Sequence, residues 1–254
     1  MIPEHIIDFL VEEKKLADSR TTGASKGERW GSQTSSRSGE SELLSLSGMR
    51  DFSENRVSSL AQEHRGVTVL FTDVVGFTQM TSQSTPADIM LMLNNLFTMF
   101  DEWSDEHRIY KVETIGDAYM CAAGLSLMRG KSRKHGASSQ VESPASHAKR
   151  MLSFALDILE DVKEFNTPTG EPLRIRVGIH TGDCMTGVVG IKMPRFCLFG
   201  DTVNTASRME SNGVPGRVHA SKAARDLLPD EDWEATGGVE AKGKGVMETF
   251  LLSP

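Results

Sequence analysis

The spacing of hydrophobic and polar residues predicts an ordered series of strands and helices. Short apolar or alternating runs are typical of strands, and apolar residues at every third or fourth position are typical of amphipathic helices. In chain order the pattern predicts a strand at 67–71, a helix at 85–103, strands at 109–115 and 118–123, a helix at 148–165, and strands at 173–179 and 185–189.

Turn residues separate these elements. Thr85-Pro86 is a helix start with proline at the first helical position, and Gly116-Asp117 is a two-residue hairpin signal. Thr181-Gly182-Asp183 is expected to turn one strand into the next. This order of elements resembles a split βαβ, ferredoxin-like sandwich, which is an α+β fold with helices on one face of an antiparallel sheet.

The C-terminal part of the chain adds shorter elements. A helix from Thr202 to Met209 is expected to be capped by Asp201 and to end near Gly213. After this helix the pattern predicts a strand at 218–220, a helix at 221–228 and a terminal hairpin through 243–245.

Composition divides the chain into three parts. Residues 1–16 read as a short amphipathic helix that precedes the domain. Residues 17–60 are rich in Ser and Gly and are expected to form a flexible linker, because they offer few apolar side chains to bury. The globular domain is expected at 61–254, with a polar insert at 126–146.

Charge and cysteine usage narrow the possible partners and compartment. A net charge of −7 argues against nucleic-acid binding, which relies on clustered Lys and Arg. The three cysteines form no pairable framework. No run approaches the roughly 18 apolar residues of a membrane span, and the N-terminus lacks a signal-peptide pattern. We therefore expect a cytoplasmic chain, or the cytoplasmic face of a larger membrane protein.

Two carboxylates stand where the chain reverses. Asp73 ends the first predicted strand, and Asp117 lies at the tip of the predicted hairpin. Neighbouring strands can bring these positions together, and paired carboxylates favour a hard divalent cation such as Mg²⁺ or Mn²⁺ between them. The alternative, that Asp73 caps a turn and Asp117 is only a hairpin residue, stays open on position alone.

The turn after Asp73 is a candidate phosphate cradle. Its residues Val74, Gly76, Phe77 and Thr78 can direct backbone N–H groups at a triphosphate. A single glycine is a weak signal, since an ordinary strand-to-helix connection has the same composition. The turn is a candidate phosphate cradle because Asp73 lies beside it.

Further polar residues could contact an anionic ligand. Asn204 and Arg208 are four residues apart in a predicted helix and share a face, although such pairs are more often solvated surface. Arg176 interrupts an apolar strand, where an arginine usually needs an anion. Lys242, in the terminal hairpin, could reach a terminal phosphate or be solvated turn charge.

Several segments resemble the class III adenylyl and guanylyl cyclase catalytic domain, in the family's order from Val67 to Leu252. They are Phe71-Thr72-Asp73-Val74-Val75-Gly76-Phe77-Thr78, Glu113-Thr114-Ile115-Gly116-Asp117-Ala118-Tyr119, Arg176-Val177-Gly178-Ile179-His180-Thr181-Gly182, Arg195-Phe196-Cys197-Leu198-Phe199-Gly200-Asp201-Thr202-Val203-Asn204-Thr205-Ala206-Ser207-Arg208-Met209-Glu210, and Gly216-Arg217-Val218-His219.

The resemblance implies a role for each candidate. Asp73 and Asp117 would bind two metal ions, Mg²⁺ or Mn²⁺. Arg176 and Lys242 would bind the triphosphate. In this family the site lies between two subunits, and the partner supplies the pair that orients the ribose and stabilises the transition state, here Asn204 and Arg208. The resemblance therefore implies a head-to-tail homodimer, and a heterodimer with a related chain would satisfy the same geometry.

The resemblance also bears on the base. Guanylyl members usually carry Glu and Cys where adenylyl members carry Lys and Asp, and this chain has Glu113 and Cys197. A carboxylate can accept the N1–H and N2 amino donors of guanine, whereas adenine presents an acceptor at N1. Arg195 stands at the position of a residue that is thought to reach the guanine in similar guanylyl cyclases. These positions imply that GTP is the substrate and cyclic GMP the product.

Three other functions fit parts of the pattern. An adenylyl cyclase would prefer ATP. A regulatory cyclase-like module would only pair with an active partner, although none of the four residues Asp73, Asp117, Asn204 and Arg208 is missing. A palm-type polymerase or diguanylate-forming enzyme shares two-metal chemistry, but its signature motif is absent and an acidic chain suits a template strand poorly. Both the guanylyl and the adenylyl cyclase interpretations are compatible with a chain that is part of a larger membrane receptor.

Overall fold

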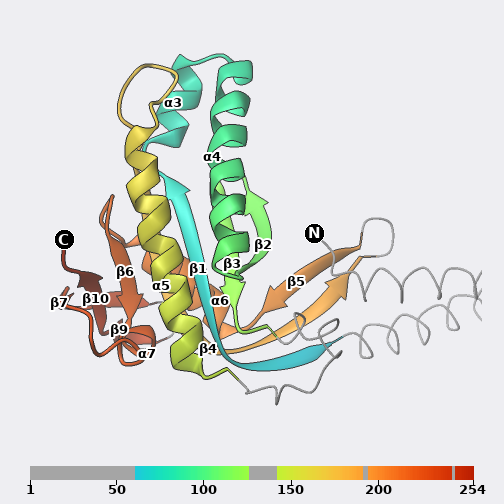
Figure 1. The fold of residues 1–254 in the computed structure, drawn as a ribbon, viewed down its shortest axis with the longest axis vertical. Helices are drawn as coiled ribbons and strands as arrows, with labels where there is room; N and C mark the ends of the chain where they lie inside the picture. Colours follow the sequence, from blue (N-terminus) through green and yellow to red (C-terminus); the bar gives the residue numbers. More distant parts are fainter. Residues whose placement is uncertain (1–60, 126–141, 191–193, 242–243) are drawn as a thin grey trace, which may run out of the picture. The chain divides into compact units, whose positions relative to one another are not determined.

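A computed structural model describes residues 61–125, 142–190, 194–241 and 244–254 (Figure 1). The described residues fall into two compact units, one made of those within 63–185 and 198–254 and the other made of 61–62, 186–190 and 194–197. The helix expected at 1–16 and the linker expected at 17–60 lie outside the described residues, as does most of the insert expected at 126–146.

An eight-stranded sheet forms the centre of the fold. Its order is β2-β3-β1-β4-β6-β10-β7, and β5 pairs with β4. The strands are β1 (Gln62–Val74), β2 (Tyr110–Ile115), β3 (Ala118–Ala123), β4 (Ile175–Val189), β5 (Arg195–Phe199), β6 (Val218–Ser221), β7 (Trp233–Ala235) and β10 (Thr249–Leu252), and β8 (Val239–Ala241) pairs with β9 (Gly245–Met247) as a separate hairpin.

Helices complete the fold. They are α3 (Phe77–Gln83), α4 (Pro86–Glu106), α5 (Pro144–Asp161), the 3₁₀ turn η2 (Val162–Glu164), α6 (Asp201–Ser211) and α7 (Lys222–Arg225). As predicted, α4 begins with proline after Thr85, whose hydroxyl accepts a bond from the Asp88 amide. The α+β class predicted from the sequence is confirmed.

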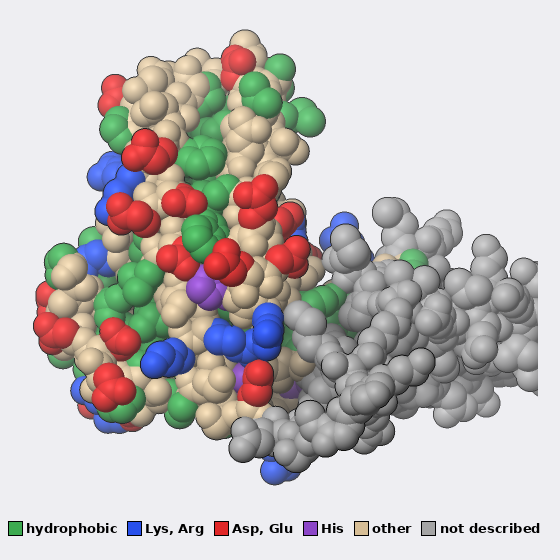
Figure 2. All heavy atoms as spheres, viewed as in Figure 1, with side chains coloured by type: hydrophobic (Ala, Val, Ile, Leu, Met, Phe, Trp, Pro, Cys, Tyr) green, Lys and Arg blue, Asp and Glu red, His purple; other side chains and the backbone are tan. Residues whose placement is uncertain are grey.

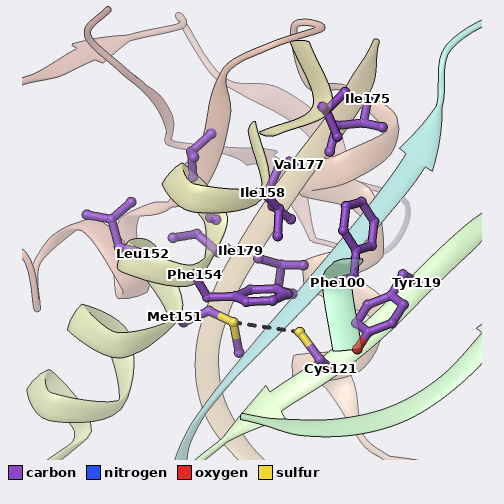
Figure 3. Close-up of a cluster of buried hydrophobic side chains, with 14 of the residues drawn as sticks. Phe100, Tyr119, Cys121, Met151, Leu152, Phe154, Ile158, Ile175, Val177 and Ile179 are labelled. Carbon is purple, nitrogen blue, oxygen red and sulfur yellow. Dashed lines mark hydrogen bonds between the residues drawn. The ribbon is translucent and has the colours of Figure 1, made fainter. Parts of the chain in front are cut away.

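The main core lies between the sheet and helices α4 and α5, which run side by side in Figure 1. Phe100 of α4 meets Tyr119 of β3 edge to face with ring centroids 5.3 Å apart (Figure 3). Phe154 of α5 and Ile179 of β4 are fully buried in the same cluster. The spacing that predicted two amphipathic helices therefore reflects their burial against one face of the sheet.

The predicted hairpin is confirmed. Ile115 of β2 pairs with Ala118 of β3 in an antiparallel ladder, and the two turn residues are Gly116 and Asp117. Gly116 has φ of 64°, the left-handed conformation for which glycine has no steric cost.

The expected turn at Thr181-Gly182-Asp183 is wrong. β4 runs through these residues as one continuous strand from Ile175 to Val189. Gly182 serves another purpose, since an added Cβ would lie 2.5 Å from the Thr202 hydroxyl of α6. Glycine here permits close approach between elements, and composition alone cannot separate that use from a turn.

The sheet is mixed, whereas an antiparallel sheet was expected. Val177 of β4 pairs with Val218 of β6 in a parallel register. The connection between these strands contains α6, and a crossover helix is the usual way to join parallel strands. The other pairs for which a register is described are antiparallel.

Helices α3, α5 and α6 differ from the predictions in informative ways. α5 begins at Pro144 inside the expected polar insert, because Ser143 caps it through a bond from the Ser146 amide. α3 was not predicted, since its Thr, Gln and Ser residues hide the helical period. Asp201 is the first residue of α6 and Gly200 is the cap residue, with no side-chain capping bond.

Figure 2 shows acidic side chains spread over the helical face, in keeping with the net charge of −7. Among the described residues on this face, no continuous basic stripe crosses the surface in view. A duplex or single-stranded nucleic acid would need such a stripe. The expectation that the chain binds no nucleic acid stays a prediction.

Candidate active site

The fold brings Asp73 and Asp117 to one pocket. In the antiparallel pairing of β1 with β3, Thr72 lies opposite Tyr119, so the end of β1 reaches the tip of the β2–β3 hairpin. The pocket has a volume of about 240 Å³. Its described lining residues are Asp73, Val74, Gly76, Phe77, Thr78, Asp117 and Arg176. All seven were candidates in the sequence.

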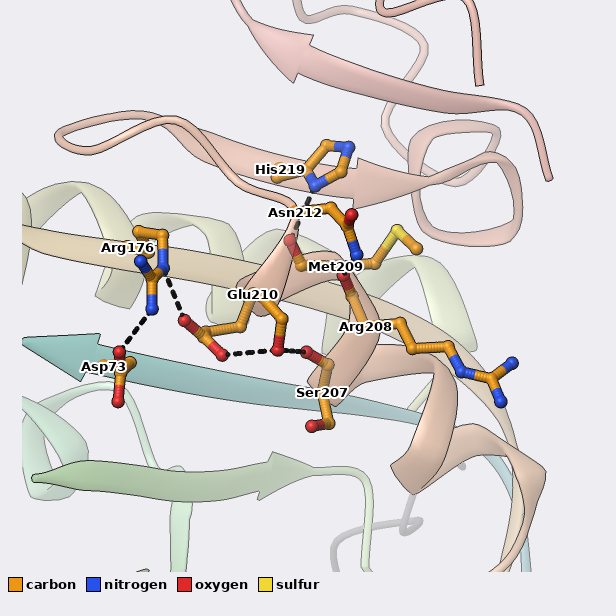
Figure 4. Close-up of polar contacts among 9 residues, drawn as sticks. Asp73, Arg176, Ser207, Arg208, Met209, Glu210, Asn212 and His219 are labelled. Atoms are coloured by element: carbon orange, nitrogen blue, oxygen red, sulfur yellow. Dashed lines mark hydrogen bonds and ion pairs between the residues drawn. The ribbon is translucent and has the colours of Figure 1, made fainter. Parts of the chain in front are cut away.

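Arg176 lies between two carboxylates. Its Nη2 donates to Oδ2 of Asp73, and its Nε donates to Oε1 of Glu210 at 2.8 Å (Figure 4). The sequence indicated that Arg176 needs an anion, and here protein carboxylates meet that need. Glu210 was not identified from the sequence, where it reads as one more polar residue at the end of a helix.

The pocket carries more negative than positive charge. Burial, followed by the nearby Asp117 and Glu210 carboxylates, raises the pKa of Asp73 to about 6, and Arg176 offsets part of this effect. The hydrogen bond to Glu210 raises the pKa of Arg176, which stays protonated. Three carboxylates face one guanidinium, so the pocket favours an additional cation.

The turn after Asp73 lines the pocket and leads into α3, and its role as a phosphate cradle stays a prediction. Gly76 has φ of 76°, and no atom lies within 4 Å of where its Cβ would be. Glycine is therefore favoured at this position by conformation rather than by space. The Val75 amide donates to the Arg174 carbonyl at 2.9 Å and fixes the turn against the start of β4.

Alternate residues of β4 face helix α6. Ile175, Val177 and Ile179 point into the core, so the residues between them lie on the opposite face. A Cβ at Gly178 would lie 1.9 Å from the backbone nitrogen of Glu210. The C-terminal half of α6 therefore packs against the bare backbone of β4, and this close approach lets Glu210 reach Arg176.

Asn204 and Arg208 are not among the described residues that line the pocket. Asn204 is exposed and Arg208 is half-buried on α6. Figure 4 shows the Arg208 side chain pointing away from Asp73 and Arg176. The chain thus separates two groups of candidate residues, the carboxylate pocket on one side and the Asn204–Arg208 face of α6 on the other.

The remaining candidates are distributed as follows. Glu113 is partly buried on β2, opposite Met120 of β3. Arg195 and Cys197 lie on β5 in the smaller unit, and the Cys197 thiol contacts the Arg195 carbonyl at 3.7 Å. Lys242 lies outside the described residues.

Comparison with known proteins identifies the family. The model of the adenylate and guanylate cyclase catalytic domain matches residues 60–254, and the chain belongs to this family. The match includes every described residue named above. The match also covers Lys242, which lies outside the described residues.

Individual relatives point toward the guanylate cyclases. The soluble subunit beta-2 of rat guanylate cyclase is 48% identical over 195 residues, which are 76% of this chain and 26% of the relative. The chain therefore spans about a quarter of that protein's length.

Solved structures agree with these relatives. The guanylate cyclase domain of RhGC from Catenaria anguillulae, in complex with GTP, has 38% identity and a TM-score of 0.66 over 76% of this chain and 98% of that domain. A rhodopsin-guanylyl cyclase core with converted specificity, in complex with ATPαS, has the same identity, TM-score and 76% coverage of this chain, with 97% of that core covered.

Proposed function

We propose that this chain is a guanylate cyclase domain, which converts GTP to 3′,5′-cyclic GMP and pyrophosphate. The observation that carries the proposal is the pocket in which Asp73, Asp117 and Arg176 meet, in a chain that belongs to the cyclase family. The direct test is a side-by-side assay of the purified chain with GTP and ATP, in Mg²⁺ and in Mn²⁺. Cyclic GMP as the main product supports the proposal, and no cyclic nucleotide from either substrate contradicts it.

Two divalent ions, Mg²⁺ or Mn²⁺, are proposed to bind at Asp73 and Asp117. Among the described residues no group of three or more His, Cys, Asp or Glu side chains has the arrangement of a metal site. Two carboxylates nevertheless suit these ions, because Mg²⁺ often takes one or two protein carboxylates and completes its shell with substrate phosphates and water. The negative excess of the pocket also favours cations.

The chemistry divides among the residues of this chain. When bound, the metal ions supply an acidified ribose 3′-hydroxyl and a polarised α-phosphate. Asp73 and Asp117 hold them in the pocket. Arg176 keeps its Nε bond to Glu210 and offers its terminal nitrogens to the triphosphate, with Lys242 as a second phosphate ligand. The residues Val74, Gly76, Phe77 and Thr78 wall the pocket beside them.

Asn204 and Arg208 are proposed to act on the nucleotide from the opposite side. Asn204 orients the ribose, and Arg208 stabilises the negative charge that builds on the α-phosphoryl oxygens during in-line attack. The leaving pyrophosphate keeps its contacts with Arg176 and Lys242. We propose no general base among the described side chains of the pocket.

A homodimer is proposed because one protomer separates these two groups. The Arg208 side chain points away from Asp73 and Arg176 (Figure 4), so a second copy is the simplest source of the missing half of each site. A heterodimer with a related chain is the alternative, and the similar soluble beta-2 protein is itself described as a subunit. The oligomeric state of the active species distinguishes the two.

Guanine is proposed to be read by Glu113 and Cys197, with Arg195 close to the base. The experiment is the double change Glu113→Lys with Cys197→Asp, which exchanges the guanylyl pair for the adenylyl pair. We expect kcat/KM to shift from GTP toward ATP, because adenine offers an acceptor where guanine offers a donor. If the double variant keeps the nucleotide preference of the wild-type chain, these residues do not recognise the base. If the wild-type chain already prefers ATP, the adenylate cyclase alternative is favoured.

The setting of the domain is also a proposal. In the described part of the chain, no helix combines the length and hydrophobicity needed to span a lipid bilayer. We propose that the domain acts on GTP in the cytoplasm, in signal transduction, either in a soluble enzyme or on the cytoplasmic face of a membrane protein. Fractionation of cells that express the full-length protein, with a cyclic GMP assay of each fraction, separates these locations.

A further inference from the structure

Helix α6 carries Asn204 and Arg208, and its N-terminus is held without a capping side chain. Gly200 occupies the cap position and makes no side-chain bond. The first turn is held instead by tertiary contacts. The Thr202 hydroxyl donates to the Asp183 carbonyl of β4 at 2.6 Å, and Lys244 contacts the same turn from the β8–β9 hairpin.

Lys244 makes two bonds to α6. Its Nζ pairs with Oδ2 of Asp201 and donates to the Thr205 hydroxyl at 3.2 Å. Thr205 is fully buried, while the Lys244 side chain is one-third exposed. The amine therefore bridges two successive turns of the helix from a hairpin that lies about 40 residues further along the chain.

Asp201 and Thr205 share a helical face with the proposed catalytic pair. At 3.6 residues per turn, positions 201, 204, 205 and 208 lie within an arc of roughly 100°. The hydrogen bond and charge of Lys244 lower the pKa of Asp201, and Arg208 contributes to the same effect through its charge. Asp201 thus lies within electrostatic reach of Arg208.

We propose that Lys244 is a positioning residue that neutralises Asp201 and holds the first turns of α6, so that Arg208 and Asn204 face the nucleotide. Without Lys244, the Asp201 carboxylate is left without its lysine partner and competes with the nucleotide for Arg208. This inference rests on the proposed function. It assigns to Lys244 no contact with GTP, and so separates its role from that of Lys242.

The experiment compares three variants of the full chain by steady-state kinetics with GTP. Lys244→Met should lower kcat between about 10- and 100-fold, the range expected when a catalytic group is displaced by a fraction of an ångström to an ångström. KM for GTP should stay within about twofold, because no substrate contact is lost. Lys244→Arg keeps the charge and should restore most of kcat. Lys222→Met is the matched control, since it breaks an exposed lysine–carboxylate pair with Glu248 at 2.7 Å and should change neither parameter.

A second-site change identifies the mechanism. Asp201→Asn in the Lys244→Met background removes the competing carboxylate and should recover kcat severalfold over Lys244→Met alone. If Lys244 only stabilised the hairpin, removing the Asp201 carboxylate as well would not restore kcat. No recovery, or wild-type kcat in Lys244→Met, overturns the inference. A raised KM with unchanged kcat also overturns it, because that result makes Lys244 a substrate ligand.

Hydrogen exchange tests the inference independently of turnover. Backbone amides of α6 from 202 to 206 should exchange faster in Lys244→Met than in the wild-type chain or in Lys222→Met. Unchanged exchange overturns the positioning role. A wild-type chain that forms no cyclic nucleotide counts against the proposed function alone, since this second measurement still decides the role of Lys244.

Discussion

At the residue scale, Arg208 is the side chain whose loss should separate chemistry from folding. It is half-buried on α6 and points away from the carboxylate pocket, so truncation should leave the core intact. Arg208→Ala should lower kcat by roughly 10³- to 10⁵-fold, the range seen for arginines that stabilise a phosphoryl transition state. The melting temperature should move by a few degrees at most.

Arg225→Ala is the control for this prediction. Arg225 stacks on the Phe250 ring at 4.4 Å, and its loss removes a surface arginine without touching the proposed site. Normal kcat in Arg208→Ala, measured beside this control, would contradict the role assigned to Arg208.

Two histidines near α6 should make the fold sensitive to acid. Burial, followed by the charge of Lys244, lowers the pKa of His180 to about 4, and burial also lowers the pKa of His219. Below pH 6.5 these histidines take up protons in the unfolded chain, whereas in the folded chain they stay neutral to a lower pH. The free energy of unfolding therefore falls as pH falls from about 6.5 toward 4. For His180 the loss approaches about 3 kcal/mol at its limit.

Asp73 opposes this effect. Its pKa of about 6 lies above the ordinary value, so the folded state gains a proton on acidification before the unfolded state does. Urea unfolding of the wild-type chain between pH 7 and 4.5 should show falling stability. The fall should be steeper in Asp73→Asn and shallower in His180→Gln. The same slope in all three proteins would show that neither group is perturbed as inferred.

At the element scale, the contact of α6 with β4 depends on Gly178. A Cβ there would lie 1.9 Å from the Glu210 backbone nitrogen, so Gly178→Ala should push α6 off the sheet and break the Arg176–Glu210 bond. We expect a loss of about 2 kcal/mol of stability, the scale of core overpacking, and loss of most cyclase activity. Gly187→Ala on the same strand is the control, because nothing lies within 4 Å of its Cβ position.

The same contact explains what the sequence could and could not predict. Periodicity predicted α4, α5 and the β2–β3 hairpin, because each has a regular apolar face or a turn with a required conformation. It misjudged β4, because Gly182 permits the approach of Thr202 rather than a turn. That distinction depends on a neighbour 20 residues away, which local patterns do not contain.

The candidate site divides in the same way. Asp73 and Asp117 were identified because each lies where the chain reverses, and Arg176 because it interrupts an apolar strand. The structure brings these three residues together. Glu210 and Lys244 were missed because a charged residue near a helix end or in a hairpin is ordinary in sequence. Only tertiary structure shows that Glu210 is buried and that Lys244 reaches α6.

At the scale of the whole molecule, the separation of the two half-sites predicts complementation between defective chains. One chain carries Asp73→Asn with Asp117→Asn, and the other carries Asn204→Ala with Arg208→Ala. Each homodimer should be inactive because both of its sites lack the same half. In a mixed dimer, one site combines the intact aspartates of one protomer with the intact α6 of its partner. Random mixing should therefore restore about a quarter of wild-type activity, from half of the dimers with one working site each.

Differently tagged chains make this experiment decisive. Purification through both tags in succession isolates the mixed dimers, and cyclic GMP is then measured on that fraction, which should have about half of wild-type activity because every dimer in it has one intact site. Mixed dimers without activity would mean that each protomer must supply both halves of its own site. Activity in either homodimer would mean that the altered residues are not required. A purified wild-type chain that becomes active only after a second, related chain is added would instead favour a heterodimer. In that case the partner that uses the Asn204–Arg208 face of this protomer is a different chain.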